Sequence, residues 1–394
     1  MAVRLLHIAD LHAGKITAKV LNRNKDLEHA LEQVLRVIKT IRVDYLIIAG
    51  DVFDKAIPDA DSEHLIYNFL VEVGLRGTTT VVIGGNHDSP KKLRNILPWG
   101  ERFKVKVFPV LDLKKFIFTD GDVAFVNVPF VHERAITDLD NDSPEGAKVS
   151  YSEKIKKLLM HGARLAENYR YRILTAHLFF DRVKLGHTER EVTVADAYAV
   201  AQSAIPETFH YAALGHIHRY QRLEEAKTIA YYTGSLYQLD FGEAEEDKFF
   251  NLVALNDNGT VEVEKIKISP LRVLRKVTVK AGEVSKLSAS VNEKGETYLW
   301  VEVEAKTPRE FLDAKEKLER VLGDKLLKLT VRYGANPERG VFRTSGDEER
   351  YFQFNPSDPV EAYRAYLSSK GKKVDPELLE FLKKLTDEVK SKTK

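Results

Sequence analysis

The stretch YLIIAGD, residues 45–51, places a carboxylate directly after an uninterrupted run of apolar, β-prone residues. Such a run, ended by glycine, is typical of a buried parallel strand. Four further apolar runs, at 3–9, 79–83, 171–175 and 211–214, are each followed by a short polar cluster. Loops beyond the carboxyl ends of parallel strands line the crevice in which an α/β protein binds its ligand. We therefore expect the five polar clusters to converge in one cleft.

These polar clusters carry side chains that bind divalent metals. They are Asp10-Leu11-His12, Gly50-Asp51, Gly85-Asn86-His87-Asp88, Ala176-His177 and Gly215-His216-Ile217-His218. Their candidate ligands are four imidazoles, two carboxylates and one amide oxygen, with His87 and Asp88 beside them, which is a ligand set for two ions. Any one cluster alone is more typical of a turn or a helix cap. Their joint occurrence at predicted strand ends favours a metal site.

The composition excludes several classes of protein. Cysteine is absent, so disulfides, zinc fingers and thiol catalysis are excluded and any metal must use oxygen and imidazole ligands. The formal net charge is only +2, so binding to nucleic acid would need a local basic surface. No run approaches the roughly 18 apolar residues of a membrane span, and no basic-then-apolar leader precedes the first strand. We expect a cytoplasmic protein, nucleoid-associated if it acts on DNA, with no membrane association.

The order of predicted elements indicates an α/β fold. Helical spacing of apolar residues over 26–41, 62–73 and 151–167 alternates with the strand runs, which is typical of a layered α/β domain. From about residue 205 strand patterns dominate, at 211–214, 228–232, 248–255 and 260–266. These later strands predict a second sheet packed on the first. The first domain is expected to span residues 1–268.

The remainder of the chain is predicted to hold a small domain and a tail. Ser269-Pro270-Leu271 indicates a boundary, and residues 271–335 have a strand–helix–strand–helix–strand pattern, with helices at 282–287 and 308–322. The polar, glycine-containing stretch 336–350 is predicted to be a linker. The tail, 351–394, is predicted to be helical over 359–370 and 375–390. An apolar stripe on the last helix comprises Leu378, Leu379, Phe381, Leu382 and Leu385. It fits either packing on the protein's own body or a groove on a partner.

The order of the five clusters resembles that of the calcineurin-like metallophosphoesterases. Their pattern runs Asp-x-His, Gly-Asp, Gly-Asn-His-Asp, His and Gly-His-x-His, and all five blocks are present. The flanking residues 46–54, 213–218 and 232–243 further resemble the SbcD nucleases within that family. The resemblance implies a two-sheet metallophosphoesterase sandwich flanked by helices, with a small α+β capping domain at 271–335 and a C-terminal helical tail.

The resemblance also implies which residues hold metal. One ion would be held by Asp10, His12, Asp51 and His218, and the other by Asp51, Asn86, His177 and His216. Asp51 would bridge the pair, and one carboxylate shared by two cations reduces their repulsion and fixes a spacing of about 3.5–4 Å. The mixture of carboxylate, amide and imidazole best suits Mn²⁺, with iron or zinc as alternatives.

His87 is assigned to catalysis, because it lies beside Asn86 without being needed as a ligand. It would stabilise charge on the phosphorane or protonate the departing sugar oxygen. Asp88 either orients His87 or caps a helix that starts at Ser89-Pro90. Asp54 stands where many relatives have histidine, so it is left out of the catalytic set. His187 is the strongest candidate for a further role among the other histidines.

For partners, the resemblance implies a homodimer that forms a heterotetramer with an SbcC-type ATPase, which the tail helices would dock. The activity implied is a manganese-dependent DNA nuclease, acting as a double-strand exonuclease and single-strand or hairpin endonuclease in break and hairpin processing. A basic rim for DNA would comprise Lys15, Lys19, Arg23, Lys55, Lys91, Lys92 and Arg94. Dimer contacts would come from Leu65, Phe69, Ile96 and Leu97, which fit the protein's own core equally well.

Two other functions are compatible with the same clusters. The first is a small-molecule or cyclic-nucleotide metallophosphodiesterase, which rarely needs a second domain and an amphipathic tail. The second is a non-catalytic scaffold on the same fold. Scaffolds of that kind lose metal ligands, and this sequence lacks none of them.

Overall fold

The computed structural model describes residues 2–132, 150–184, 199–244, 246–287, 296–333, 340–343, 351–354, 358–369 and 375–392. The chain divides into two compact units, Met1–Leu274 and Arg275–Lys394. None of the described helices is both long and apolar enough to cross a membrane.

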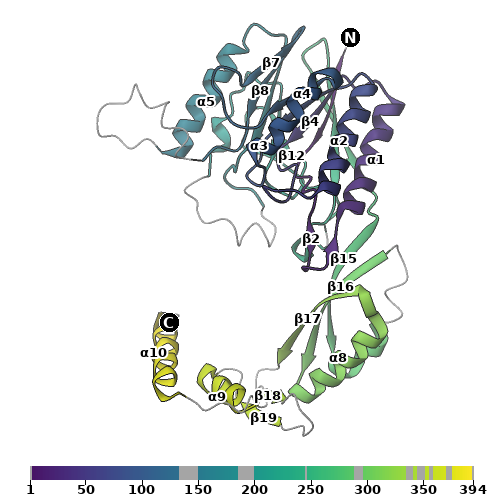
Figure 1. The fold of residues 1–394 in the computed structure, drawn as a ribbon. Helices are drawn as coiled ribbons and strands as arrows, with labels where there is room; N and C mark the ends of the chain where they lie inside the picture. Colours follow the sequence, from purple (N-terminus) through teal and green to yellow (C-terminus); the bar gives the residue numbers. More distant parts are fainter. Residues whose placement is uncertain are drawn as a thin grey trace. The chain divides into compact units, whose positions relative to one another are not determined.

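Two six-stranded sheets form the first unit (Figure 1). The first sheet has the order β14 (Val261–Lys267), β13 (Phe249–Leu255), β1 (Val3–Ile8), β4 (Tyr45–Ala49), β5 (Thr79–Ile83) and β6 (Val105–Phe108). The second has the order β11 (Gln221–Arg222), β12 (Ile229–Tyr232), β10 (Tyr211–Gly215), β9 (Tyr171–His177), β8 (Val123–Val128) and β7 (Ile117–Asp120). In each sheet four neighbouring strands run parallel, so their following loops gather at one edge.

Helices cover the outer face of each sheet, which gives four layers. α1 (Asn24–Thr40) and α2 (Ala60–Leu75) pack on the first sheet, and α5 (Tyr151–Leu165) packs on the second (Figure 1). The successive residues Ile47 and Ile48 of β4 lie in different clusters, one between the sheets and one beneath the helices. Because side chains alternate along a strand, β4 is buried on both faces, and this requires its uninterrupted apolar sequence. The predicted two-sheet α/β class is therefore confirmed.

The strands after residue 205 do not form a sheet of their own, so that prediction was wrong. β13 and β14 return to the first sheet, where β13 pairs antiparallel with β1. β7, β8 and β9, which precede residue 205, belong to the second sheet. Pairing between strands far apart in the chain depends on register and packing, which the order of strand signals does not contain.

Side-chain caps mark the start of several helices. Asp59 precedes α2 and its Oδ1 accepts a hydrogen bond from Ser62 N at 2.9 Å. Ser150 precedes α5 and its hydroxyl accepts from Glu153 N at 3.3 Å. These bonds satisfy backbone donors that have no partner within the helix.

The second unit is built on a three-stranded sheet with the order β15 (Arg272–Lys280), β16 (Glu296–Ala305) and β17 (Leu326–Tyr333). Leu299, Val301 and Val303 of β16 form a buried cluster with α8 (Pro308–Leu322). The helix expected at 282–287 is the 3-10 helix η7 (Ala281–Lys286), a segment too short for a regular α-helix.

The stretch predicted to be a linker contains a strand, which corrects the sequence prediction. β18 (Gly340–Arg343) pairs antiparallel with β19 (Tyr351–Phe354), so the predicted tail also begins with a strand. Both strands are short β-prone segments whose polar, glycine-containing surroundings obscured them. The helices α9 (Pro359–Ser369) and α10 (Pro376–Lys392) follow, close to their expected positions.

Candidate metal centre

The structure brings the five polar clusters together at one edge of the sandwich. The loops after β1 and β4 are joined by hydrogen bonds from Asp10 N to Gly50 O (3.1 Å) and from His12 N to Asp51 O (3.0 Å). Asp10 Oδ1 accepts from His216 N at 2.9 Å, which joins the loop after β10 to the same site. Asp51 Oδ1 accepts from His87 N at 2.9 Å, which joins the loop after β5. The predicted convergence therefore exists in the fold.

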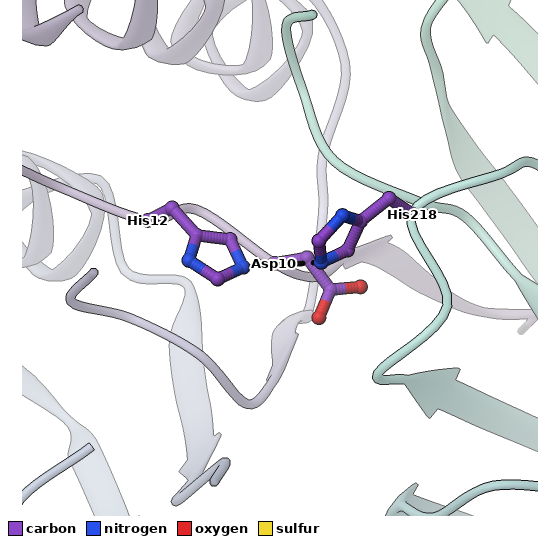
Figure 2. A group of neighbouring side chains, drawn as sticks. All are labelled: Asp10, His12 and His218. Carbon is purple, nitrogen blue, oxygen red and sulfur yellow. Dashed lines mark hydrogen bonds between the residues drawn. The ribbon is translucent and has the colours of Figure 1, made fainter. Parts of the chain in front are cut away.

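Asp10, His12 and His218 form the first group of side chains, drawn in Figure 2. The Nε2 atoms of His12 and His218 face each other at 3.2 Å. The Oδ2 atom of Asp10 is buried and has no hydrogen-bond partner among the described residues. Three potential ligand atoms from two sheets thus face a common point.

A second group surrounds the other side of Asp51. His177 Nε2 lies 3.4 Å from Asp51 Oδ2 and 3.1 Å from Asn86 Oδ1. His216 Nδ1 lies 3.0 Å from the same Asn86 oxygen. Asp51 Oδ2 also lies 3.6 Å from His12 Nε2. One carboxylate oxygen therefore faces both groups.

The backbone at these residues is strained. Asp10, His12, Asp51 and His216 have φ angles of 52°, 43°, 49° and 101°, in the left-handed region that non-glycine residues rarely adopt. Such conformations cost about 1–3 kcal/mol each and are concentrated at functional sites. Gly50 also has positive φ, and a Cβ there would lie 2.2 Å from His177 Nδ1. The loop after β4 therefore needs glycine for both its conformation and the approach of His177.

Hydrogen bonds fix the orientation of two imidazoles. His177 Nδ1 donates to Ala49 O at 2.8 Å, and His218 Nδ1 donates to Glu243 Oε1 at 3.1 Å. Each ring therefore presents its Nε2 atom to the centre. Histidines that bind metal usually donate their other N–H to a carbonyl or carboxylate oxygen in this way.

This arrangement fits divalent metal ions. The Nε2 atoms of His12 and His218 lie 3.2 Å apart. Both offer a lone pair to a cation when each ring carries its proton on Nδ1, where Asp54 and Glu243 lie at 3.3 Å and 3.1 Å. Buried carboxylates and neutral imidazoles are the ligands that such cations prefer. Among the described residues, a third group, His12, Asp54 and His87, also has the composition and spacing to hold an ion.

Comparison with known proteins identifies the family. Residues 3–220, more than half of the chain, match the family model of the calcineurin-like phosphoesterases. The chain belongs to this family. It is also similar to the SbcD subunit of the nuclease SbcCD of Bacillus subtilis (strain 168), 26% identical over 309 residues that cover 77% of this chain and 78% of the relative. The protein of that name in Staphylococcus saprophyticus is 25% identical over 284 residues, covering 71% and 72% of the two chains.

Among solved structures, the phosphoesterase is similar to purple acid phosphatase PPD1 from yellow lupin (Lupinus luteus) seeds. The identity is 13%, the TM-score is 0.39, and the match covers 68% of this chain and 52% of the lupin chain.

The charge state of the metal-free phosphoesterase centre is set by burial and by one ion pair. Burial raises the pKa of Asp10 to about 6 and lowers the pKa of His12 to about 4 and of His216 to about 3. Burial opposes ionisation of His177 as well, but the Asp51 carboxylate raises the pKa of His177 to about 9. Metal binding must displace this proton, so metal affinity falls as the pH falls below that value.

Glu243 is a residue of the centre that the sequence analysis did not assign. It is buried, and its two oxygens contact His218 Nδ1 (3.1 Å) and Lys248 Nζ (2.6 Å). Burial alone would raise the pKa of Glu243, but the Lys248 ammonium lowers it well below the usual range. The only indication of its role in the sequence was that it lies within residues 232–243, a stretch that resembles the SbcD nucleases.

Replacing Glu243 by glutamine is expected to weaken metal binding about 10- to 100-fold, because partners that orient metal-binding histidines contribute this much to affinity. Glu246→Gln is a matched control, since Glu246 lies 3.5 Å from the same Lys248 Nζ, and its second ion pair is with Arg219. Titration of both variants with Mn²⁺ measures the difference. Equal affinities in the two variants would exclude a role for Glu243 in orienting His218.

Asp54, left out of the predicted site, also lies in it. Its Oδ1 is 3.3 Å from His12 Nδ1 and 3.2 Å from Lys15 Nζ. Of its two predicted roles, Asp88 does not serve as the helix cap. Its carboxylate accepts hydrogen bonds from the backbone N–H groups of Val52, Phe53 and Gly85, at 2.9–3.1 Å, and so ties the loops after β4 and β5 together. The short helix α3 (Pro90–Leu93) begins after Ser89 instead.

Part of the predicted basic rim is wrong. Arg23 is fully buried, where its Nε donates to Asp26 Oδ2 at 2.8 Å, so it cannot contact DNA from there. Lys15 and Lys92 are half-buried and paired with Asp54 and Glu63. The predicted rim residues that are exposed are Lys19, Lys55, Lys91 and Arg94.

The predicted dimer residues divide between core and surface. Phe69 and Ile96 belong to the buried cluster beneath α1 and α2, and Leu65 packs against it. Their apolar character is therefore explained by the protein's own core. Leu97 is exposed, so of the four it is the most available for a dimer contact. His187 lies outside the described residues.

Proposed function

We propose that the chain is a metal-dependent DNA nuclease that hydrolyses phosphodiester bonds at a centre of two divalent ions, with Mn²⁺ as the preferred metal. The observation that carries this proposal is the position of Asp51 Oδ2, 3.6 Å from His12 Nε2 and 3.4 Å from His177 Nε2. When bound, two cations sharing a carboxylate would stabilise the charge that develops on a phosphodiester. Similarity to two proteins named as nuclease subunits supports a nucleic acid as the substrate.

The proposed ligands follow the two groups of side chains. One ion would be held by Asp10, His12, Asp51 and His218, and the other by Asp51, Asn86, His177 and His216. Asp10, His12, Asp51 and His177 are buried, whereas Asn86 is exposed and His87, His216 and His218 are half-buried. A substrate would therefore approach from the side of the second group.

His87 is proposed to act on the substrate from its half-buried position beside His12. Its Nδ1 donates to Asp54 O at 2.9 Å, which fixes the ring and leaves Nε2 free for proton transfer. Its ring also lies edge-on to His12, with centroids 4.8 Å apart. Nε2 of His87 would deliver a proton to the departing sugar oxygen, a role that typically contributes 10²–10⁴-fold to rate.

Digestion of end-labelled duplex, hairpin and single-stranded DNA with Mn²⁺ tests this proposal. We expect cleavage of DNA that excess mononucleotide or cyclic nucleotide does not inhibit, and loss of cleavage on addition of a chelator. Preferential hydrolysis of the small phosphodiesters would instead support the metallophosphodiesterase alternative. Absence of any hydrolysis by metal-loaded protein would support the scaffold alternative.

We further propose that α10 docks an ATPase of the SbcC type. Leu378, Phe381 and Leu385 are 47%, 61% and 41% exposed, and their spacing of three and four residues places them on one helix face. Leu379 is buried instead, so the predicted stripe is only partly covered. Three exposed apolar side chains on one face are typical of a helix that binds in a partner's groove.

Replacing Leu378, Phe381 and Leu385 together by serine is expected to weaken ATPase binding about 100-fold or more, because central apolar anchors carry most of the energy of such interfaces. Intrinsic manganese-dependent nuclease activity should be unchanged. The control variant replaces the exposed polar residues Glu377, Glu380 and Lys383 by serine on the same helix. Co-purification and a binding titration with the ATPase measure the effect, and equal binding by both variants would contradict the docking proposal.

A further inference from the structure

A chain of hydrogen bonds crosses the core between the two sheets of the first unit. His7, on β1, lies with its Nδ1 2.9 Å from Tyr211 Oη and its Nε2 3.2 Å from Leu214 O, both on β10. Asn251 Nδ2, on β13, donates to Tyr211 Oη at 3.0 Å. Tyr220 Oη donates to Asn251 Oδ1 at 3.0 Å. His7, Tyr211 and Asn251 are fully buried.

The chemistry of these groups fixes which atom donates and which accepts in each hydrogen bond. Leu214 O can only accept, so His7 Nε2 carries the proton and donates to it. His7 Nδ1 then accepts from the Tyr211 hydroxyl, whose oxygen accepts from the Asn251 amide. Burial lowers the pKa of His7 to about 3, consistent with the neutral ring that this arrangement needs. His7, Tyr211 and Asn251, the buried residues of this hydrogen-bond network, therefore each have partners within it.

The residues around this hydrogen-bond network are apolar. Leu5 on β1, Ala9 just after β1 and Ala213 on β10 belong to the cluster between the sheets. Apolar contacts are non-directional, whereas hydrogen bonds hold two atoms within a narrow range of distance and angle. The contact of His7 with Tyr211 and Leu214 therefore specifies how β1 and β10 are placed relative to each other.

This placement matters for the candidate metal centre because its ligands come from both sheets. Asp10 and His12 follow β1, and His216 and His218 follow β10. Asp10 is three residues beyond His7, and His216 is two residues beyond Leu214. The first group of ligands therefore combines side chains from the two strands that His7 joins.

We propose that His7 is a positioning residue that holds β10 in place opposite β1, across the core between the two sheets, so that His218 meets Asp10 and His12 around one metal ion. The inference rests on the proposed metal centre. His7 does not touch the reacting atoms, and its effect would pass through the two strands.

Three variants of the full-length chain test the inference. In the double variant His7→Leu/Tyr211→Phe, apolar groups replace both partners of the central hydrogen bond. Leu214 O and Asn251 Nδ2 lose their partners, so some loss of stability is expected, and the thermal unfolding temperature reports it. In His7→Gln, the amide can donate to Leu214 O and accept from Tyr211. Leu5→Ala is the matched control, because it removes packing between the same sheets two residues earlier on the same strand.

Titration with Mn²⁺, followed by the electron paramagnetic resonance of the free ion, gives stoichiometry and affinity, and thermal unfolding without metal gives stability. We expect the double variant to bind Mn²⁺ about 10- to 100-fold more weakly than wild type, a size typical of lost support for metal ligands. His7→Gln should restore most of the affinity. Leu5→Ala should unfold at a lower temperature yet bind Mn²⁺ as wild type does.

If the double variant bound Mn²⁺ with wild-type affinity, the positioning role of His7 would be refuted, while the proposed metal centre would stand. Weakened binding in Leu5→Ala, in proportion to its loss of stability, would also overturn the positioning role, because general destabilisation would then explain the effect. Failure of the wild-type chain to bind Mn²⁺ would instead refute the proposed metal centre, and the inference with it.

Discussion

Replacing Asp51 by asparagine is expected to abolish binding of both metal ions and DNA cleavage together. The same Asp51 oxygen faces His12 and His177, so the substitution removes the one charge that both groups share. Metal ions at such centres contribute several kcal/mol of charge stabilisation, so cleavage should fall by about 10³-fold or more. Metal content after dialysis against Mn²⁺ and cleavage of labelled duplex DNA measure the two effects.

Asp44→Asn provides the matched control for this experiment. Asp44 lies just before the other end of β4, where its side chain accepts from Arg4 N at 3.0 Å. The same chemical change there should leave metal content and cleavage intact. If Asp51→Asn retained two ions per chain, Asp51 would not be the shared ligand.

Replacing His87 by alanine is expected to leave both metal ions bound while cleavage falls about 10²–10⁴-fold, the usual contribution of a general acid. Metal binding should persist because His87 Nδ1 donates to Asp54 O and because the two groups of ligands around Asp51 do not include the His87 ring. Metal analysis of the purified variant, beside single-turnover cleavage, separates the two effects.

His64→Ala is the control for the His87 variant. His64 is an exposed histidine on α2 whose ring contacts Asn68 at 2.8 Å, so its loss should change neither metal content nor cleavage. Loss of one ion from His87→Ala would instead make His87 a ligand, together with His12 and Asp54, which form the third group of side chains able to hold metal.

The sequence could predict that the five clusters converge, because the position of a residue at a strand end is a local property. Asp10, Asp51, Asn86 and the histidines each follow an apolar run, and parallel strands place those ends at one edge of a sheet. Sheet membership could not be predicted in the same way. The pairing of β13 with β1 depends on packing between residues far apart in the chain.

Residues that support the centre through tertiary contacts were harder to predict. Glu243 reaches His218 across 25 positions of sequence, and His7 reaches Leu214 across 207. From the sequence, Arg23 was expected at the surface, but in the structure it is buried and paired with Asp26. Charged and polar side chains are usually exposed, so only the packed structure distinguishes the buried, paired ones.

Anomalous diffraction from crystals soaked in Mn²⁺ tests the central claim most directly. We expect two peaks about 3.5–4 Å apart with Asp51 Oδ2 between them. One would lie among Asp10, His12 and His218, and the other among Asn86, His177 and His216. No peak in this pocket, or a single peak among His12, Asp54 and His87, would contradict it.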